Sequence, residues 1–148
     1  HIDARDLAAF MLDSMESSRG GTYNLVCPRS DQTTTRRLLE ACVSVTGSRA
    51  ELVWVDPEVL ARARIAEWEQ LPGWIAPGSE GQGMHNCDVS AAVEAGLRCR
   101  PIEQTVADTW EWLREIPPGQ RPPLRAGVPG RRGLSGEQEQ MIWWLIGR

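Results

Sequence analysis

The sequence contains no lysine, because all sixteen basic residues of the 148-residue chain are arginine. A catalytic lysine, a lysine Schiff base and the lysine of a phosphate-binding loop are therefore excluded for this chain. The sequence also lacks an apolar run of the roughly 18–20 residues that a membrane-spanning helix requires. Its start does not combine basic residues with an apolar stretch, as a secretory signal does. We therefore expect a cytoplasmic protein that binds no membrane.

Histidine and tyrosine are almost as scarce as lysine. His1 and His85 are the only histidines, and Tyr23 is the only tyrosine. Neither the GxSxG pattern of serine hydrolases nor the HExxH pattern of zinc proteases is present. The net charge of −4 weighs against a nucleic-acid partner. Composition alone therefore assigns no catalytic residue.

The four cysteines are far apart in the sequence and form no CxxC pair; they are Cys27, Cys42, Cys87 and Cys99. This spacing is typical of reduced thiols packed inside a cytoplasmic protein. A zinc site that recruits His85 beside Cys87 is disfavoured, because zinc sites use closely spaced pairs of ligands. A disulfide framework is disfavoured because a chain of this size can stabilise itself without one. We expect no metal site.

The first 65 residues alternate between helical and strand patterns. Capping residues and apolar periodicity predict three helices, which are 4–17, a helix from a Thr33 or Thr34 cap to Gly47, and a helix that begins at Asp56-Pro57. Short apolar runs rich in strand formers predict two strands, 22–27 ("TYNLVC") and 51–56 ("ELVWVD"). The alternation predicts an α/β fold with a few short, mainly parallel strands.

The first of these helices has a defined cap and a predicted apolar face. Asp3 is the expected cap, and Asp6 favours the first turn. An acidic catalytic pair is the alternative interpretation of these two carboxylates, and capping is the preferred one. The residues that share the apolar face at helical spacing are Leu7, Phe10, Met11 and Met15.

Residues 67–84 form an irregular stretch that carries large apolar side chains among glycines and prolines. Loops of this length often line functional sites. We therefore select Trp74, Met84 and His85 as candidate substrate-binding residues. The alternative is that the tryptophans of this loop, Trp68 included, only cover the core beneath them.

The remainder predicts three further helices. Asp88 is expected to cap a short helix that ends at Gly96, and a longer helix should run over 102–114 with a buried stripe of Ile102, Val106, Trp110 and Leu113. Residues 117–134, rich in proline, glycine and arginine, indicate a linker. Ser135 and Gln138 form a capping box for a last helix, whose apolar face is Met141, Trp144 and Leu145.

The linker contains a glycine spacing that imitates a dinucleotide-binding turn, "GVPGRRG" at Gly127–Gly133. That turn requires an apolar strand before it and a helix that begins inside it. Here "RPPLRA" precedes the glycines and Pro129 lies among them. We therefore interpret the segment as linker.

Four segments, in order, resemble the second half of extended short-chain dehydrogenase/reductases, the NAD-dependent epimerase/dehydratase family. They are "HIDARDLA", "GGTYNLV", "DVSAAVEAGLRCRP" and "TVADTWEWL". The resemblance covers residues 1 to about 115 and is nearest to the reductase-like branch, through "RDLA", "LVWV", "LP.W" and "AGLR.RP". Ala91 departs from the basic residue that is usual there. Met84-His85-Asn86 replace the arginine that contacts a sugar-nucleotide phosphate, which argues against such a substrate.

The resemblance implies the C-terminal portion of a Rossmann-type α/β protein, with a substrate-binding portion over 1–116, a linker over 117–134 and a C-terminal helix over 135–148. The family's cofactor turn and its catalytic Tyr-x-x-x-Lys pair are expected upstream of His1. Tyr23 is followed by Cys27 in place of that lysine, so Tyr23 matches a structural position. No catalytic or cofactor-binding residue is expected here.

These implications define the expected function. The intact parent would be an NAD- or NADP-dependent oxidoreductase, epimerase or dehydratase, and this chain would be its substrate-binding half, inactive and without a cofactor by itself. Its partners would be a small-molecule substrate and the upstream dinucleotide-binding domain, with a homodimer left open. The alternative is a standalone, non-catalytic binding or interaction module that contacts a partner through Trp143 and Trp144.

Overall fold

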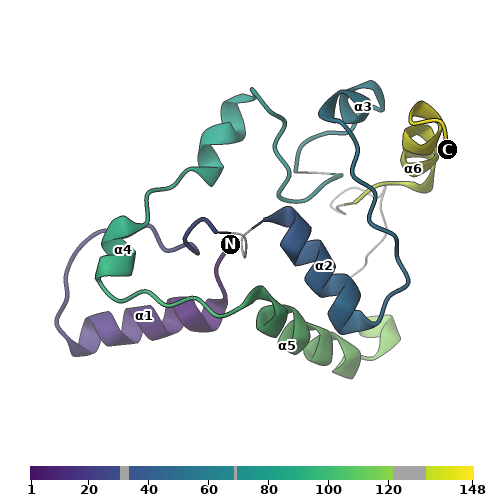
Figure 1. Ribbon diagram of the computed structural model, residues 1–148. Coiled ribbons are helices and arrows are strands. Elements are labelled where there is room, and N and C mark those ends of the chain that lie inside the picture. The colour runs from purple at the N-terminus through teal and green to yellow at the C-terminus, as the bar shows by residue number, and fades with distance from the viewer. Residues whose placement is uncertain (31–33, 69, 122–132) are drawn as a thin grey trace. The chain divides into compact units, whose positions relative to one another are not determined.

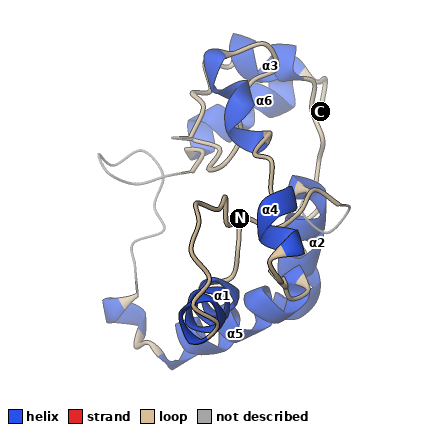
Figure 2. Cartoon of the chain, turned by 90° about the vertical axis from the view of Figure 1, so that its left-hand side faces the viewer, coloured by secondary structure: helices blue, strands red, loops and turns tan. Residues whose placement is uncertain are grey.

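The structure is a computed structural model that describes residues 1–30, 34–68, 70–121 and 133–148. The chain forms two compact units, each built from two separate stretches. Unit 1 contains residues 1–52 and 87–118, and unit 2 contains residues 53–86 and 119–148. Regular structure in the described part of the chain is almost entirely helical (Figures 1 and 2).

The described part of unit 1 contains four helices close to their expected positions. They are α1 (Ala4–Glu16), α2 (Thr35–Thr46), α4 (Ser90–Glu94) and α5 (Ile102–Glu115). Asp88, the expected cap of α4, lies one residue before the N-cap Val89 and accepts a hydrogen bond from the amide of Ser90. The side chain of Asp3 accepts a hydrogen bond from the amide of Arg5, and Thr34 caps α2 in the same way. Gly47 ends α2 with a φ of 64°, a left-handed conformation that glycine adopts without strain. Helix α2 packs along α5 (Figure 1).

The core of unit 1 joins α1 to α4. Phe10, Ala92 and Leu97 are its buried residues, and the ring of Tyr23 meets Phe10 edge-on at 5.3 Å between centroids. The sequence predicts that Met11 and Met15 lie on the apolar face of α1. This prediction is wrong, because the two side chains are 55% and 74% exposed. The buried stripe runs through Asp6 and Phe10, one turn apart, so Met11 and Met15 fall on the neighbouring face.

Unit 2 is built around α3 (Pro57–Arg62) and α6 (Gly136–Leu145), which pack together. Asp56 caps α3, and the expected capping box of Ser135 and Gln138 begins α6. Two 3-10 helices complete the regular structure of the described residues, η2 (Glu80–His85) and η3 (Pro118–Gln120). The buried residues of the unit 2 core are Leu60, Ala63, Ile65 and Ile142.

The apolar face expected for α6 is wrong for Met141 and Trp144, whereas Leu145 packs against the unit 2 core. Ile142 is the residue that α6 buries, whereas Met141 and Trp144 are 48% and 72% exposed. Helix α6 has apolar side chains on several sides, so its sequence does not select one face. Trp143 lies under the guanidinium of Arg148, at 5.8 Å from the ring centroid.

The two strands expected over 22–27 and 51–56 form no strand ladder. The described residues contain one isolated bridge, between Glu67 and Leu71, and no longer strand pairing. A strand exists only where a second backbone segment accepts its hydrogen bonds. The amide of Cys27 instead donates a single bond to the carbonyl of His1, at 2.8 Å. The mostly helical structure is compatible with part of an α/β protein.

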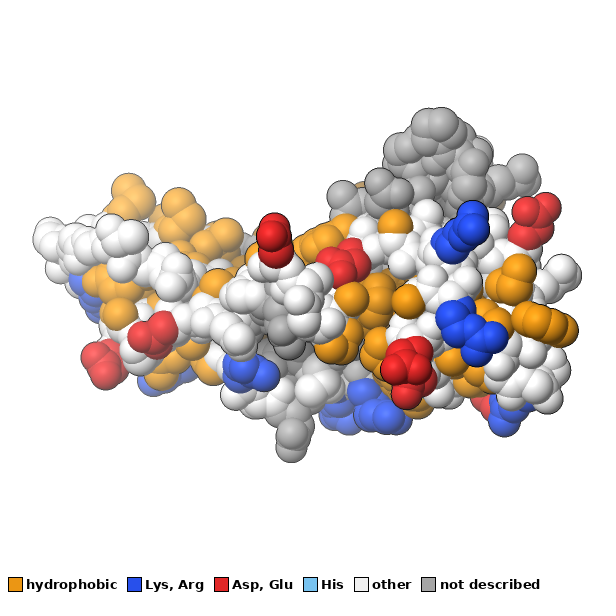
Figure 3. Space-filling view, turned by 90° about the horizontal axis from the view of Figure 1, so that it is seen from above, with side chains coloured by type: hydrophobic (Ala, Val, Ile, Leu, Met, Phe, Trp, Pro, Cys, Tyr) orange, Lys and Arg blue, Asp and Glu red, His pale blue; other side chains and the backbone are white. Residues whose placement is uncertain are grey.

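Some expectations fall outside the described residues, namely Thr33 and most of the linker with its "GVPGRRG" segment. Among the helices that are described, none combines the length and apolar character of a membrane span. Figure 3 shows charged side chains of both signs scattered among hydrophobic ones on the face it presents.

The packing of α6 predicts unequal effects from two neighbouring truncations. Ile142→Ala should lower the free energy of unfolding by roughly 2–5 kcal/mol, because it leaves a cavity in the unit 2 core. Met141→Ala is the matched control and should change it by about 0.5 kcal/mol or less. Urea unfolding followed by circular dichroism measures both. Equal losses in the two variants would show that the burial of α6 is misassigned.

Candidate functional site

Two carboxylates at the start of α1 are nearly inaccessible to solvent. Asp3 is 7% exposed and Asp6 is 9% exposed. Buried carboxylates are stable only when hydrogen-bond donors and positive charges surround them. Their partners are Arg5, Arg100 and Thr105, and we call these five residues the carboxylate–arginine cluster.

Asp3 connects the start of α1 to α5. Its carboxylate accepts bonds from the guanidinium of Arg5, with 2.7 Å from Nη2 to Oδ2, and from Thr105 Oγ1 at 2.7 Å. The Arg5 hydrogen bonds hold the pKa of Asp3 well below its usual range, against the opposing effect of burial. Arg5 also forms an ion pair with Asp108 of α5, so α1 and α5 are joined twice.

Asp6 binds Arg100 through three donors. The backbone amide of Arg100 donates to Oδ2 at 2.8 Å, and its Nε and Nη2 lie 2.8 and 2.7 Å from Oδ1. Burial raises the pKa of Asp6, but the hydrogen bonds from Arg100 outweigh it and the net shift is downward. Asp6 in turn raises the pKa of Arg100. Both carboxylates are therefore ionised near neutral pH, which suits a positioning role and excludes a general acid.

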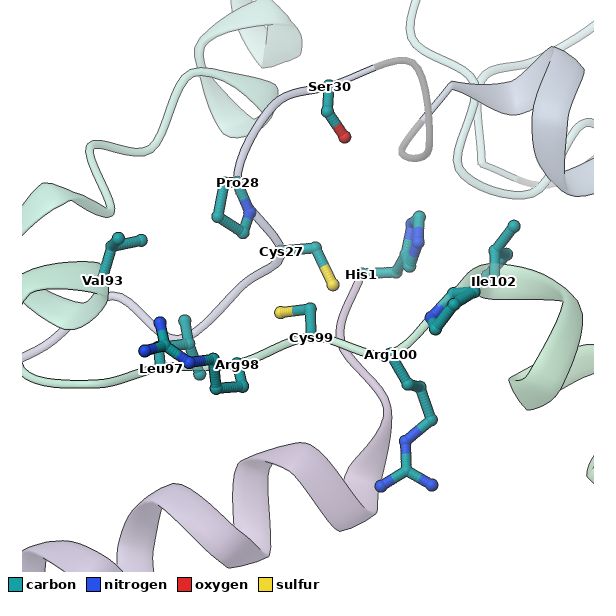
Figure 4. A pocket seen from close by; sticks show the side chains of 11 residues that line it. His1, Cys27, Pro28, Ser30, Val93, Leu97, Arg98, Cys99, Arg100 and Ile102 are labelled. Carbon is teal, nitrogen blue, oxygen red and sulfur yellow. The ribbon is translucent and has the colours of Figure 1, made fainter.

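A pocket of approximately 500 Å³ lies beside this cluster in unit 1 (Figure 4). Its lining comes from the chain start, from the segment that follows Tyr23 and from the connection between α4 and α5, as His1, Cys27, Pro28, Ser30, Val93 and residues 97–102. Arg100 belongs to both the pocket and the cluster. Figure 4 shows its guanidinium directed away from the pocket, toward α1. The cluster thus fixes one wall of the pocket.

The pocket combines apolar walls with a few polar groups. Leu97 and Ile102 are buried at 3% and 6% exposure, and the thiols of Cys27 and Cys99 lie close together (Figure 4). Arg98 is exposed, and no ion pair is found for it among the described residues. A volume of this size suits a small organic ligand, and Arg98 supplies positive charge for an anionic group.

The three candidate substrate-binding residues lie elsewhere, in unit 2. Trp74 packs against the unit 2 core, as the core-covering interpretation predicts. Met84 is 60% exposed on η2, and His85 ends η2 with a side chain outside the described set. Trp74 and Met84 are not among the residues that line the pocket of unit 1, and the substrate-binding role of all three residues stays a prediction.

The loop that carries these residues is held by one carboxylate. Glu67 accepts a hydrogen bond from the amide of Ala76 at 3.0 Å and from Ser79 Oγ at 3.3 Å. These bonds tie Glu67 to Ala76 and Ser79 on the far side of the loop.

Sequence reasoning missed the Cys27–Cys99 pocket because it considered cysteines only by their spacing. The usable signal was that Cys99 and Arg100 lie inside "AGLRCRP", one of the segments quoted for the family resemblance. Among the described residues, no group of three side chains from histidine, cysteine, aspartate and glutamate could hold a metal ion. Comparisons with protein-family models, curated proteins and solved structures found no match to the chain.

The Asp6–Arg100 pair predicts a large effect from a small substitution. Asp6→Asn should lower the free energy of unfolding by roughly 1–3 kcal/mol, because it leaves Arg100 with an unpaired charge and poorer acceptors. Asp13→Asn, on the exposed side of the same helix, is the matched control and should stay within about 0.5 kcal/mol of wild type. Urea unfolding at neutral pH distinguishes them. A loss in Asp13→Asn as large as in Asp6→Asn would contradict the pairing.

The same carboxylates predict acid sensitivity. The pKa values of Asp3 and Asp6 are lowered by folding, so they stabilise the folded state above their unfolded values of about 4. That stabilisation is lost as pH falls from about 4 through the lower folded values. We expect the stability difference between wild type and Asp6→Asn to narrow progressively on acidification below about pH 4, measured by urea unfolding at a series of pH values. A difference that stays constant or widens would refute the assignment.

Proposed function

We propose that this chain is the C-terminal, substrate-binding portion of an NAD(P)-dependent oxidoreductase, epimerase or dehydratase similar to extended short-chain dehydrogenase/reductases. The observation that carries the proposal is that the four segments of the resemblance, separated along the sequence, pack together in unit 1. If the four short motifs matched only by chance, nothing would lead them to contact one another in the folded chain.

The contacts between these segments are specific. "HIDARDLA" is joined to "AGLRCRP" by Asp6 and Arg100, and to "TVADTWEWL" by Asp3 and Thr105. "GGTYNLV" is joined to "DVS" by Asn24, whose Nδ2 donates to the carbonyl of Asp88 at 2.8 Å. Phe10, two residues after the first segment on the same helix, meets Tyr23 of the second segment edge-on. Each segment therefore contacts at least one other.

Under this proposal, the pocket of unit 1 takes a small-molecule substrate. Its apolar walls would exclude water from the bound molecule, and Arg98 would orient an anionic or strongly polar group. The residues present do not fit a nicotinamide cofactor, since the sequence has no lysine and no glycine-rich turn in a strand–helix context. We therefore assign NAD or NADP, together with the catalytic pair, to the domain proposed upstream.

The reading frame upstream of the His1 codon provides the direct test. We expect it to encode a glycine-rich turn after a strand and a Tyr-x-x-x-Lys pair. A start codon immediately before His1 would overturn the proposal. Fluorescence titration of the purified chain with NADH and NADPH gives a second readout, with no saturable binding expected. Tight binding by this chain alone would contradict the placement of the cofactor.

A standalone binding or interaction module is the second candidate, and α6 favours it. Trp144 is 72% exposed and Met141 is 48% exposed three residues earlier, so they share one apolar helix face. Large exposed aromatic side chains are enriched where proteins associate. A start codon directly before His1 would favour this candidate over the first.

A further inference from the structure

The pocket of unit 1 holds two nucleophilic sulfur atoms that the proposed function does not use. Cys27 and Cys99 are both free thiols, and they come from segments far apart in the sequence. In Figure 4 the two sulfur atoms lie close to each other at the pocket wall, and burial together with the neighbouring Cys27 raises the pKa of Cys99. The fold brings this pair of cysteines together, although their spacing in the sequence shows no motif.

The backbone on both sides of the pair is held in place. The amide of Cys27 donates to the carbonyl of His1 at 2.8 Å. Cys99 lies between Leu97, which is 3% exposed, and Arg100, whose amide and side chain are bound by Asp6. Both segments are thus held at positions from which the two thiols approach each other.

We propose that Cys27 and Cys99 are a reversible modification site, at which exchange with a low-molecular-weight disulfide such as glutathione disulfide joins them in an intramolecular disulfide along the pocket wall. The bond would fasten the segment after Tyr23 to the segment that Asp6 already holds. It would also replace two thiols of the pocket lining with an apolar disulfide, so the redox state would change which ligands the pocket accepts.

The exchange takes place in two balanced steps. The Cys27 thiolate attacks one sulfur of glutathione disulfide, breaking that bond, forming a mixed disulfide and releasing one glutathione thiolate. The Cys99 thiol then gives up its proton and attacks the Cys27 sulfur, which forms the Cys27–Cys99 bond and expels the second glutathione. Two protein thiols are oxidised by two electrons, and one disulfide is reduced to two thiols.

The environments of the two thiols set this order of attack. Burial, reinforced by the hydrogen bond with Cys27, raises the pKa of Cys99 to about 12. Cys99 therefore stays protonated near neutral pH and is a poor first nucleophile. Cys27 is thus the attacking residue and Cys99 the resolving residue.

The test uses the full chain equilibrated with mixtures of glutathione and glutathione disulfide. Remaining thiols are blocked with N-ethylmaleimide, and peptides are mapped by mass spectrometry without reduction. We expect a linked peptide pair that contains Cys27 and Cys99, with Cys42 and Cys87 alkylated. Alkylated Cys27 and Cys99 in the most oxidising mixture, or pairing of either with Cys42 or Cys87, would overturn the proposal. This mapping needs no substitution, so a folding defect cannot mask it.

Two serine variants test the order of attack, with Cys42→Ser as the control. Cys99→Ser should accumulate a stable glutathione adduct on Cys27. Cys27→Ser should form the glutathione adduct on Cys99 more slowly than Cys99→Ser forms it on Cys27, because burial keeps the remaining Cys99 thiol protonated near neutral pH. Cys42→Ser should form the linked pair as wild type does. Equal rates at Cys27 and Cys99 would refute the assigned roles.

Discussion

Unit 1 depends on the interaction of Asp6 with Arg100. Ninety-four residues separate the two side chains in the sequence, and three donors of Arg100 converge on one buried carboxylate. The backbone amide among these donors is decisive, because it fixes the course of the chain between α4 and α5 rather than only a side chain. Asp3 extends the same network to Thr105 of α5. The start of α1 therefore organises the second sequence stretch of the unit.

This network explains why a pocket can exist beside it. A pocket wall that is formed by a loop has few backbone hydrogen bonds. Without other contacts, such a loop would sample several conformations. Here the loop of residues 97–101 is tied at Arg100, buried at Leu97 and continued into α5 at Ile102. Because the guanidinium of Arg100 is directed toward α1 (Figure 4), its positive charge is paired with the carboxylates of Asp6 and Asp3. The exposed Arg98, the two thiols, His1 and Ser30 remain as polar groups of the lining.

The features that the sequence predicts correctly are those that depend on neighbouring residues, such as helix starts. Asp3, Thr34, Asp56 and Ser135 begin the helices expected of them, because a cap bonds to an amide two or three residues away. The pairing of Asp6 with Arg100 needs tertiary structure, so the capping rule described Asp6 only in part. The prediction of the buried face of α6 was partly wrong for a related reason. Apolar side chains surround that helix, and only its neighbour α3 selects Ile142. The pocket was missed because its walls meet only after folding.

The two segments with strand composition present the remaining conflict between local preference and structure. Residues 22–27 and 51–56 are rich in strand formers, yet neither has a ladder partner among the described residues. Natural sequences rarely contradict their own fold at two places. A strand former without a partner retains its preference, since pairing depends on a second backbone segment and not on the residue alone. Under the proposed function, further strands of a dinucleotide-binding domain would supply hydrogen-bond partners for the two segments.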